Sequence, residues 1–600
     1  MRFSRRVLGV LTTAGLVSGL VVGPLGAAEA AGGGVVRVNQ LGYGAFDGKA
    51  AYVMTRDAAT GVRFQVVDRH GRRVLTGPIG ADAGEWNATY RHVYQLDLST
   101  LKTPGSYRLE VPGAAAADFE VRASSARLRT GAKDKAVGFF TAQRDTAHHN
   151  DRAASVYETP EFAGPDTDQT VGELRQLGGP VDVSGGWYDA GDYLKFTHIA
   201  AYSDSLLWAS ARDRRDRTVL AEARHGLDWL DRMWDERTRT LYIQVGVGTG
   251  NVEGTFIGDH DIWRLPGVDD NLTDPSERHL RNRPVFRAAV PGQPISPNLA
   301  GRTAAAFALA AQVEPNRATA RRHLETAAQI FAQAKTENVG QLVTSLPFAF
   351  YPETAWRDDL ELGATELALA ARRLGDRRAG AWLRRAGHWA TQYLEHEAGG
   401  DTLNLYDVSA LAHADLIRAA SADRPLVRRL AGDLRAQLEI GAARAKGDPF
   451  RAGAQYDNFD AVPHAFGLAA TARLYRQTTG DRRYDDFGQQ QLDWTFGANP
   501  WGVSFMIGVG RTAERCPHHQ IANITGRELT GAVVNGPNSA GLFEEGLGDH
   551  LDGMNPCPAD GVDRYAEFTG RGSRYVDDVR SWQASEPADD FAAIAVYALT

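Results

Sequence analysis

The stretch Ala123-Ser124-Ser125-Ala126 divides the 600-residue sequence into two parts with different periodicities. On its N-terminal side, residues 35–122 contain short alternating runs, such as Tyr107, Leu109 and Val111 after a Pro-Gly turn. Alternation of apolar and polar residues between turn residues is typical of half-buried β-strands. Residues 35–122 therefore predict a small β-sandwich domain.

On the C-terminal side, residues 127–600 carry a helical period instead. Leu220, Leu227 and Leu230 recur on one helical face, and Ala304–Ala311 is rich in alanine. Further helices are predicted at Leu360–Leu374, Ala381–Leu394, Val408–Ala420, Leu426–Ala445, His464–Tyr475, Tyr484–Trp494 and around Phe591–Leu599. Long loops rich in Gly, Pro, Trp, His and Asp separate them, and such loops are usually functional. Antiparallel helix pairs of this kind can close into a toroid with a loop-built cleft at one end.

The composition excludes several classes of protein. The chain is 43% apolar and 23% charged, which is typical of a globular protein, and its net charge of −8 argues against a nucleic-acid partner. The two cysteines, Cys516 and Cys557, are too few for a disulfide-rich scaffold or a four-thiolate zinc site. In an oxidising exterior they either pair or stay as buried thiols, and the sequence leaves both alternatives open.

The N-terminus has the three parts of a secretory signal peptide. Three arginines lie within residues 1–6, residues 7–28 carry no charge, and Ala28-Glu29-Ala30 fits a small-x-small cleavage site. We therefore predict a signal peptide over residues 1–30 and a secreted protein. A membrane anchor is the less favoured alternative, because Pro24 and many small or polar residues weaken the apolar run. Nothing else in the sequence predicts a membrane span.

Residues 185–196, GGWYDAGDYLKF, hold the first candidate site. Asp189 and Asp192 are three residues apart in a glycine-rich turn, so both carboxylates can point into one space. Carboxylates held together raise one another's pKa, which suits a general base. An Asp-x-x-Asp pair alone is more often a helix cap or a cation-binding loop.

Three further loops carry candidate residues. Glu586 precedes Pro587 before the last helix, where an isolated acid usually only favours the helix dipole. The adjacent histidines of residues 516–520, CPHHQ, lack a third metal ligand, so we expect them to bind a polar substrate. The acids of residues 351–361 either compensate a helix dipole or, with Asp407, form an oxygen cage for Ca²⁺.

These motifs occur in the order found in glycoside hydrolase family 9. The segments that carry the resemblance are GGWYDAGDYLKF, DHDIW, NLAGRTAAAFALA, the acidic helix start at 358–361, GANPWGVSF, CPHHQ, VVNGPN, RYVDD and SWQASEP. The resemblance implies a mainly α fold, with an (α/α)6 barrel over residues 127–600. VNQLGYGAFDGKAAYV and LSTLKTPGSYRLEVPG resemble the immunoglobulin-like β-sandwich that often precedes this barrel, which implies such a domain over residues 35–122.

The resemblance also implies residue roles. Asp192 matches the general base that activates water, Asp189 its partner, and Glu586 the general acid. Hydrolysis with inversion requires the two carboxyl groups to lie roughly 6.5–9.5 Å apart, with the acid's pKa raised. The predicted substrate contacts are Trp187, His260, Trp263, Tyr351, Trp356, His518, His519 and Gln520, and the predicted calcium ligands are Thr354, Asp358, Asp359 and Asp407. Each tryptophan fits a core position as readily as a sugar platform.

The sequence departs from the family pattern at three places. Gln520 stands where the family usually has arginine and cannot supply its charge, which puts the usual cellulose subsite in doubt. Residues 143–149 lack the cysteine of the zinc site that many relatives carry, so no zinc is predicted there. The segment 148–181 is divergent, and its loops would shape one end of the cleft.

The predicted function is a secreted, monomeric, inverting β-1,4-glucanase acting on cellulose or related β-glucans. One alternative is an exo-acting glycosidase on short β-linked oligosaccharides, including amino sugars, which an acidic residue near a blocked cleft end would favour. The other is an inactive carbohydrate-binding protein, against which the three intact carboxyl residues argue. We expect the N-terminal domain to stabilise or orient the barrel rather than bind glycan, because its exposed aromatics, such as Tyr43 and Tyr90, make no obvious stripe.

Overall fold

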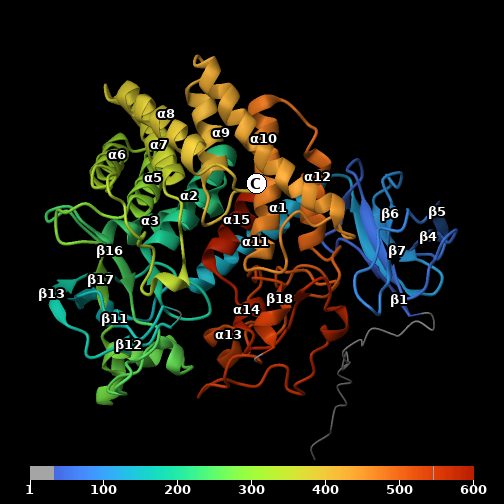
Figure 1. The fold of residues 1–600 in the computed structure, drawn as a ribbon, viewed down its shortest axis with the longest axis horizontal. Coiled ribbons are helices and arrows are strands. Elements are labelled where there is room, and N and C mark those ends of the chain that lie inside the picture. The colour runs from blue at the N-terminus through green and yellow to red at the C-terminus, as the bar shows by residue number, and fades with distance from the viewer. Residues whose placement is uncertain (1–32, 166, 545) are drawn as a thin grey trace, which may run out of the picture.

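The computed structural model describes residues 33–600 except 166 and 545. The predicted signal peptide, residues 1–30, lies outside the described residues. A β-rich domain lies beside a helical domain, and the loops of the helical domain gather at one end of it (Figure 1).

Two sheets form the N-terminal domain. One contains β6 (His92–Asp97), β3 (Ala50–Thr55), β1 (Gly34–Arg37) and β8 (Ala114–Ala115), and the other contains β2 (Tyr43–Gly44), β9 (Ala117–Arg122), β7 (Gly105–Glu110), β4 (Arg63–Asp68) and β5 (Arg73–Pro78). Their alternating apolar residues meet in one core, where Val53, Val66, Leu96 and Leu109 are fully buried. The predicted β-sandwich is confirmed.

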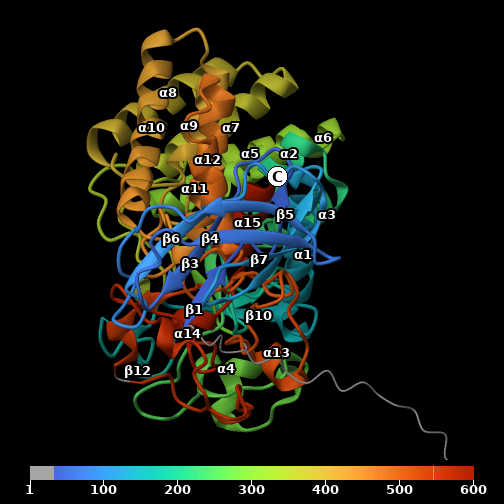
Figure 2. The ribbon, with the colours of Figure 1, turned by 90° about the vertical axis from the view of Figure 1, so that its right-hand side faces the viewer.

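The sandwich lies against the helical domain (Figure 2), and an aromatic contact joins the two. The ring of Trp86 is buried against Phe450 and Trp501, and its Nε1 donates a hydrogen bond of 2.8 Å to the carbonyl of Phe568. Tyr43 and Tyr90 are also buried, so the expectation that they are exposed is wrong. They contribute to the domain core and to the contact with the barrel.

Six inner helices form a closed ring: α2 (Thr197–Arg214), α5 (Pro297–Val313), α7 (Arg357–Leu374), α9 (Ser409–Ala419), α11 (Ala461–Thr479) and α15 (Asp589–Leu599). Each packs on the next, and α15 packs on α2. Each inner helix also packs on one outer helix, from α3 (Arg217–Arg232), α6 (Arg317–Phe331), α8 (Ala379–His396), α10 (Arg424–Gly447), α12 (Asp485–Thr495) and α1 (Ser125–Gln143). Within the described residues this is an (α/α)6 barrel, as predicted.

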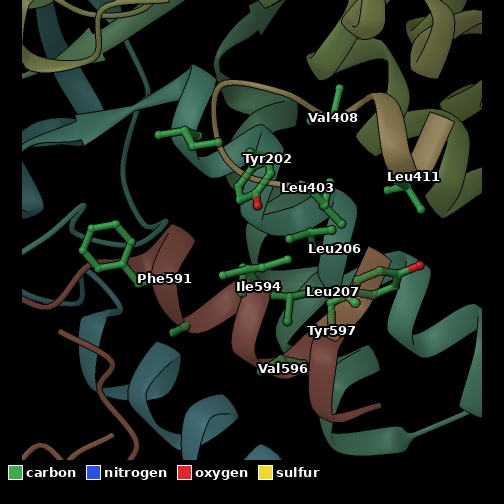
Figure 3. Close-up of a cluster of buried hydrophobic side chains, with 14 of the residues drawn as sticks. Tyr202, Leu206, Leu207, Leu403, Val408, Leu411, Phe591, Ile594, Val596 and Tyr597 are labelled. Carbon is green, nitrogen blue, oxygen red and sulfur yellow. The ribbon is translucent and has the colours of Figure 1, made fainter. Parts of the chain in front are cut away.

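The inner helices are buried on nearly every side because they pack on both neighbours and on an outer helix. Figure 3 shows Ile594 and Tyr597 of α15 beside Leu206 and Leu207 of α2. The helices α5 and α7 approach so closely that a Cβ on Gly301 would lie 2.5 Å from the backbone of Asp359. Small residues therefore allow the inner ring to close.

The loop end carries the remaining short elements. They are β10 (Ala154–Tyr157), β11 (Glu161–Phe162), β12 (Thr170–Val171), β13 (Gln176–Val181), β14 (Lys195–Phe196), β15 (Trp234–Asp235), β16 (Thr240–Val245), β17 (Val285–Arg287), β18 (Asn538–Ser539), β19 (Ser573–Arg574), α4 (Arg278–Arg281), α13 (Gln520–Thr525) and α14 (Trp582–Ser585). Cys516 and Cys557 are joined by a disulfide, which decides between the two alternatives for these cysteines. Over the described ranges, no helix combines the length and apolar character that crossing a bilayer requires.

Candidate active site

The loop that carries the two aspartates is held in a tight turn. The backbone N–H of Asp189 donates to the carbonyl of Leu194 at 2.9 Å, and Asp192 Oδ1 accepts from the N–H of Leu194 at 2.8 Å. Between them, a Cβ on Gly191 would lie 2.0 Å from the carbonyl oxygen of His518, so only glycine fits. The turn therefore fixes both carboxylates against the CPHHQ loop.

The segment before α15 meets this turn. Gly191 N–H donates to Glu586 Oε1 at 3.4 Å, and the N–H of Asp589 donates to the carbonyl of Asp189 at 2.9 Å. Asp189, Asp192 and Glu586 therefore lie in one site, although 394 residues of sequence separate Asp192 from Glu586.

Glu586 is suited to donate a proton. Burial and the neighbouring charge of Asp192 raise its pKa to about 8, and His260 opposes this only in part. A carboxyl group with such a pKa is mostly protonated at neutral pH, as a general acid must be.

A histidine between two carboxylates holds Asp192. His260 Nε2 lies 3.1 Å from Asp192 Oδ2, and its Nδ1 lies 2.8 Å from Asp168 Oδ2. Burial disfavours the charged ring, but the hydrogen bonds to Asp168 and Asp192 outweigh burial and keep the pKa of His260 well above its ordinary value. An imidazolium donates from both nitrogens, so it can serve both carboxylates at once.

Asp189 has a different partner. The hydroxyl of Tyr351 donates to Asp189 Oδ2, while Asp189 Oδ1 has no hydrogen-bond partner among the described residues. Burial and the charge of Asp589 raise the pKa of Asp189 well above its ordinary value. The free oxygen is thus available to a water molecule or a sugar hydroxyl.

Carboxyl groups outnumber cations at this end of the barrel. Asp589 and Asp590 are buried beside Asp189, and burial raises the pKa of both well above the ordinary range. Among the described residues, the one ion pair that the acids of this site make is between Asp192 and His260. The site is therefore strongly acidic.

Four of the predicted substrate contacts point elsewhere. Trp187 donates to Glu222 Oε1 at 2.8 Å and packs on a core phenylalanine, and Trp356 packs on Trp389 of α8. His519 Nε2 bonds to Gln143 Oε1 at 2.8 Å. Gln520 Oε1 accepts from the N–H of Arg264 at 3.2 Å. All four side chains are buried. They position loops rather than offer groups to a ligand, which corrects the prediction for them.

Three of the other four predicted contacts, His260, Tyr351 and His518, lie beside the carboxyl groups, and Trp263 packs on His518. His260 and Tyr351 bond to the aspartates directly. His518 packs on Trp263 with ring centroids 5.1 Å apart, and burial lowers the pKa of His518 to about 4, so its ring is neutral. Trp263 is buried behind this ring, where it supports His518 instead of offering a sugar platform.

The predicted calcium site is only partly assembled. Asp359 is paired with Arg302 at 2.7 Å, and Thr354 is exposed to solvent. Asp358 and Asp407 remain: Asp358 Oδ1 is buried without a partner, and burial together with the charge of Asp407 raises the pKa of Asp358. In the described part of the chain, no group of three or more His, Cys, Asp or Glu side chains could hold a metal ion. The four predicted ligands are therefore not assembled as one set, although Asp358 and Asp407 lie close enough for their charges to interact.

Asp168 is a site residue that the sequence did not reveal. It lies in the divergent segment 148–181 and accepts hydrogen bonds from Thr249 Oγ1 at 2.7 Å and from His260. No local motif marks Asp168, because its partners come from a distant loop. The only signal for Asp168 in the sequence is that it is an acidic residue in this divergent segment.

The loop end of the barrel thus brings two aspartates and a glutamate with a raised pKa into one site, and paired carboxyl groups of this kind can hydrolyse glycosidic bonds. The family model "Glycosyl hydrolase family 9" matches residues 130–599, and "Cellulase N-terminal ig-like domain" matches residues 31–116. The chain therefore belongs to glycosyl hydrolase family 9, and the resemblance stated from the motifs is confirmed.

Individual relatives are distant. Endoglucanase A of Bacillus pumilus is 24% identical over 422 residues, which cover 66% of this chain and 60% of that protein. Endoglucanase B of Cellulomonas fimi is 25% identical over 60% of this chain and 35% of that protein. The chain thus spans less than two thirds of the length of either relative.

Solved structures establish the fold over most of the chain. An endoglucanase from Alicyclobacillus acidocaldarius superposes with a TM-score of 0.66 at 22% identity, covering 94% of this chain and 98% of that chain. A Bacteroides ovatus family 9 structure superposes with a TM-score of 0.69 at 20% identity and the same two coverages. Both matches include the N-terminal domain and the barrel.

Proposed function

We propose that this protein is a secreted, inverting endo-acting hydrolase of β-1,4-glucosidic bonds in cellulose or related β-glucans. The observation that supports this most is the contact of Glu586 with the backbone of Gly191, between Asp189 and Asp192. This contact supports an acid with a raised pKa close to both aspartates. The names of the relatives, all endoglucanases, support the substrate class.

In the proposed reaction each carboxyl group has one task. Glu586 gives its proton to the departing glycosidic oxygen, and the C–O bond breaks as water attacks the anomeric carbon from the opposite face. Asp192 takes a proton from that water, and Asp189 orients the water. Burial raises the pKa of Asp192, and the imidazolium of His260 opposes that rise, which favours the ionised form that a base needs.

Two measurements test the proposal. Reducing-sugar release from carboxymethyl cellulose, mixed-linkage glucan and cello-oligosaccharides is expected for the wild type and absent for Glu586→Gln. NMR of the first product should show the α-anomer from a β-linked substrate. Null release by both proteins on every substrate would favour a carbohydrate-binding protein without catalysis, and a β-anomer would contradict inversion.

The second candidate is an exo-acting hydrolase of short β-linked amino-sugar oligosaccharides. Asp168 in the divergent segment and the unpaired acids Asp589 and Asp590 favour it, because a buried excess of carboxylates attracts an ammonium group. Chitosan oligosaccharides cleaved faster than cello-oligosaccharides of equal length would select this candidate. A clear preference for neutral glucans would reject it.

For calcium, we propose that Asp358 and Asp407 hold the ion together with backbone oxygens, as a structural ligand. Two adjacent buried carboxyls gain most from a cation. Titration with CaCl₂ after chelation should raise the thermal unfolding midpoint, and Asp407→Asn should abolish that rise. An unchanged midpoint in the wild type would contradict the calcium site.

A further inference from the structure

Two exposed aromatic rings stack on each other at the loop end of the barrel. Phe459 is 39% exposed and Trp582 is 42% exposed, and their rings lie 5.9 Å apart at an interplanar angle of 17°. They come from loops 123 residues apart in sequence. Large apolar side chains are seldom left exposed next to each other without a partner to cover them.

The pair lies next to the candidate general acid. Trp582 begins α14, and Glu586 follows this single turn directly, so about 6 Å of helical rise separates them. Asn535 connects the two positions: its backbone N–H donates to the carbonyl of Glu586 at 3.0 Å, and its Nδ2 donates to the carbonyl of Trp582 at 3.2 Å. The distance between aromatic pair and acid is therefore fixed.

The other ring of the pair is also tied to the site. Phe459 precedes Asp460, which has a left-handed backbone with φ of 63°. The charge of Asp460 acts on Asp590, one of the buried acids beside Asp189, and on Tyr406. The loop that presents Phe459 thus turns sharply from the exposed ring into the buried acids.

The position of the pair defines which part of a substrate it can touch. A general acid lies beside the leaving-group oxygen, so sugars on the Glu586 side belong to the departing chain. His260 and Asp168 lie instead with the base, Asp192. Aromatic rings bind the C–H faces of pyranoses and need no charged partner.

We propose that Phe459 and Trp582 form a sugar-binding platform for the leaving-group part of a β-linked glucan chain. This inference rests on the proposed function, since it uses Glu586 as the acid. It adds a subsite for a neutral pyranose at two residues that the motifs did not single out. The platform determines where along an oligosaccharide the enzyme cuts.

The test compares Trp582→Ala and Phe459→Leu with the wild type. Phe459→Leu keeps an apolar contact with Trp582 but removes the ring. This variant therefore still tests the platform if Trp582→Ala disturbs the fold. Phe46→Ala is the matched control, because Phe46 is an 80% exposed aromatic residue on the N-terminal domain. Substrates are β-1,4-linked glucose pentamers carrying ¹⁸O at the reducing end, and a nitrophenyl β-cellobioside whose small leaving group does not reach a sugar platform.

We expect KM for the pentamer to rise about three- to thirtyfold in both variants, with little change for the nitrophenyl substrate. The preferred cut in the pentamer should move toward the reducing end, because binding modes with fewer departing sugars gain weight. A merely structural role would lower activity on both substrates without moving the cut.

Unchanged KM and an unchanged cutting pattern in folded Phe459→Leu, with an active wild type, would overturn the platform alone. A wild type that releases nothing from any glucan would instead overturn the proposed function and the platform with it. The two failures are therefore distinguishable.

Discussion

Two buried charge clusters share the loop 183–196, and they differ in balance. In the first, which we call the balanced cluster, Lys195 Nζ donates to Asp145 and Asp151 at 2.9 Å each, and Arg283 pairs with the same two acids. In the second, which we call the catalytic cluster after its proposed role, Asp189, Asp192 and Glu586 lie together, and His260 pairs with Asp192.

The balance decides what the acids can do. Burial works against charge in both places, but in the balanced cluster Lys195 and Arg283 outweigh it and lower the pKa of Asp145 well below its ordinary value. In the catalytic cluster burial is offset only in part, and the pKa of Glu586 rises to about 8. Acids that stay ionised hold the loop in place, whereas acids that can gain and lose protons are suited to the proposed chemistry.

The largest effect is expected from a substitution in the catalytic cluster. Asp192→Asn should lower kcat on cello-oligosaccharides about 10²–10⁴-fold, because the amide cannot take a proton from water. Azide, a nucleophile that needs no base, should restore part of the rate. Retention of more than a tenth of the wild-type kcat would remove Asp192 from the role of base.

The matched substitution in the balanced cluster should act on folding instead. Asp145→Asn leaves Lys195 and Arg283 with one carboxylate too few, so the free energy of unfolding should fall by about 3–5 kcal/mol. Urea denaturation measures this, and kcat per folded molecule should be nearly unchanged. Equal stability of variant and wild type would refute the distinction between the two clusters.

The sequence predicts the parts of the fold that depend on local pattern. The change of period at 123–126, the alanine-rich helix at 304–311 and the spacing of Asp189 and Asp192 are all local. The sequence leaves the burial of Trp187 open and does not predict that of Gln520, because their burial depends on Glu222 and Arg264, which other parts of the chain supply. A motif records which residue types a site uses, not which of them face the ligand.

Dependence on distant parts of the chain also explains why the sequence did not reveal Asp168 and Phe459. Asp168 gains its role only when His260 is brought beside it, and Phe459 only when it meets Trp582. Lys195 follows Asp192 by three residues, yet it pairs with Asp145 and Asp151 of the balanced cluster, which the spacing does not predict.

A smaller effect is expected at His260, which lies between Asp168 and Asp192. Asp168→Asn removes one of the two carboxylates that keep His260 charged, so Asp192 loses a cationic donor and its pKa rises further. Since the proposed base must be ionised, the acidic limb of the kcat/KM profile should move to higher pH by roughly one pH unit. Asp259, Glu586 and His518 also face this pair and stay unchanged.

Thr249→Val is the control for Asp168, because it removes the other hydrogen bond to this carboxylate and keeps its charge. Its acidic limb should stay within a few tenths of a pH unit of the wild type. If both variants shift the limb equally, Asp168 acts through loop geometry and not through the charge of His260.

The smallest expected effect is the cost that the catalytic cluster imposes on stability. The pKa of Glu586 is about 8 in the folded protein, well above the value of about 4.3 in an unfolded chain. A group with a raised folded pKa stabilises fully below its unfolded pKa, and that stability is lost as pH rises toward the folded pKa. Wild-type stability should therefore decline between pH 5 and pH 8 through this carboxyl.

Glu586→Gln removes the titration, so the variant should gain stability relative to the wild type over that interval. Solvent reaches the half-buried side chain, and the gain is therefore of order 1–2 kcal/mol at pH 8. Urea denaturation at pH 5 and pH 8 measures it, with the exposed Glu528→Gln as control. Parallel curves for all three proteins would mean that Glu586 ionises in the folded state as easily as in the unfolded chain, and the contrast with the balanced cluster would then be lost.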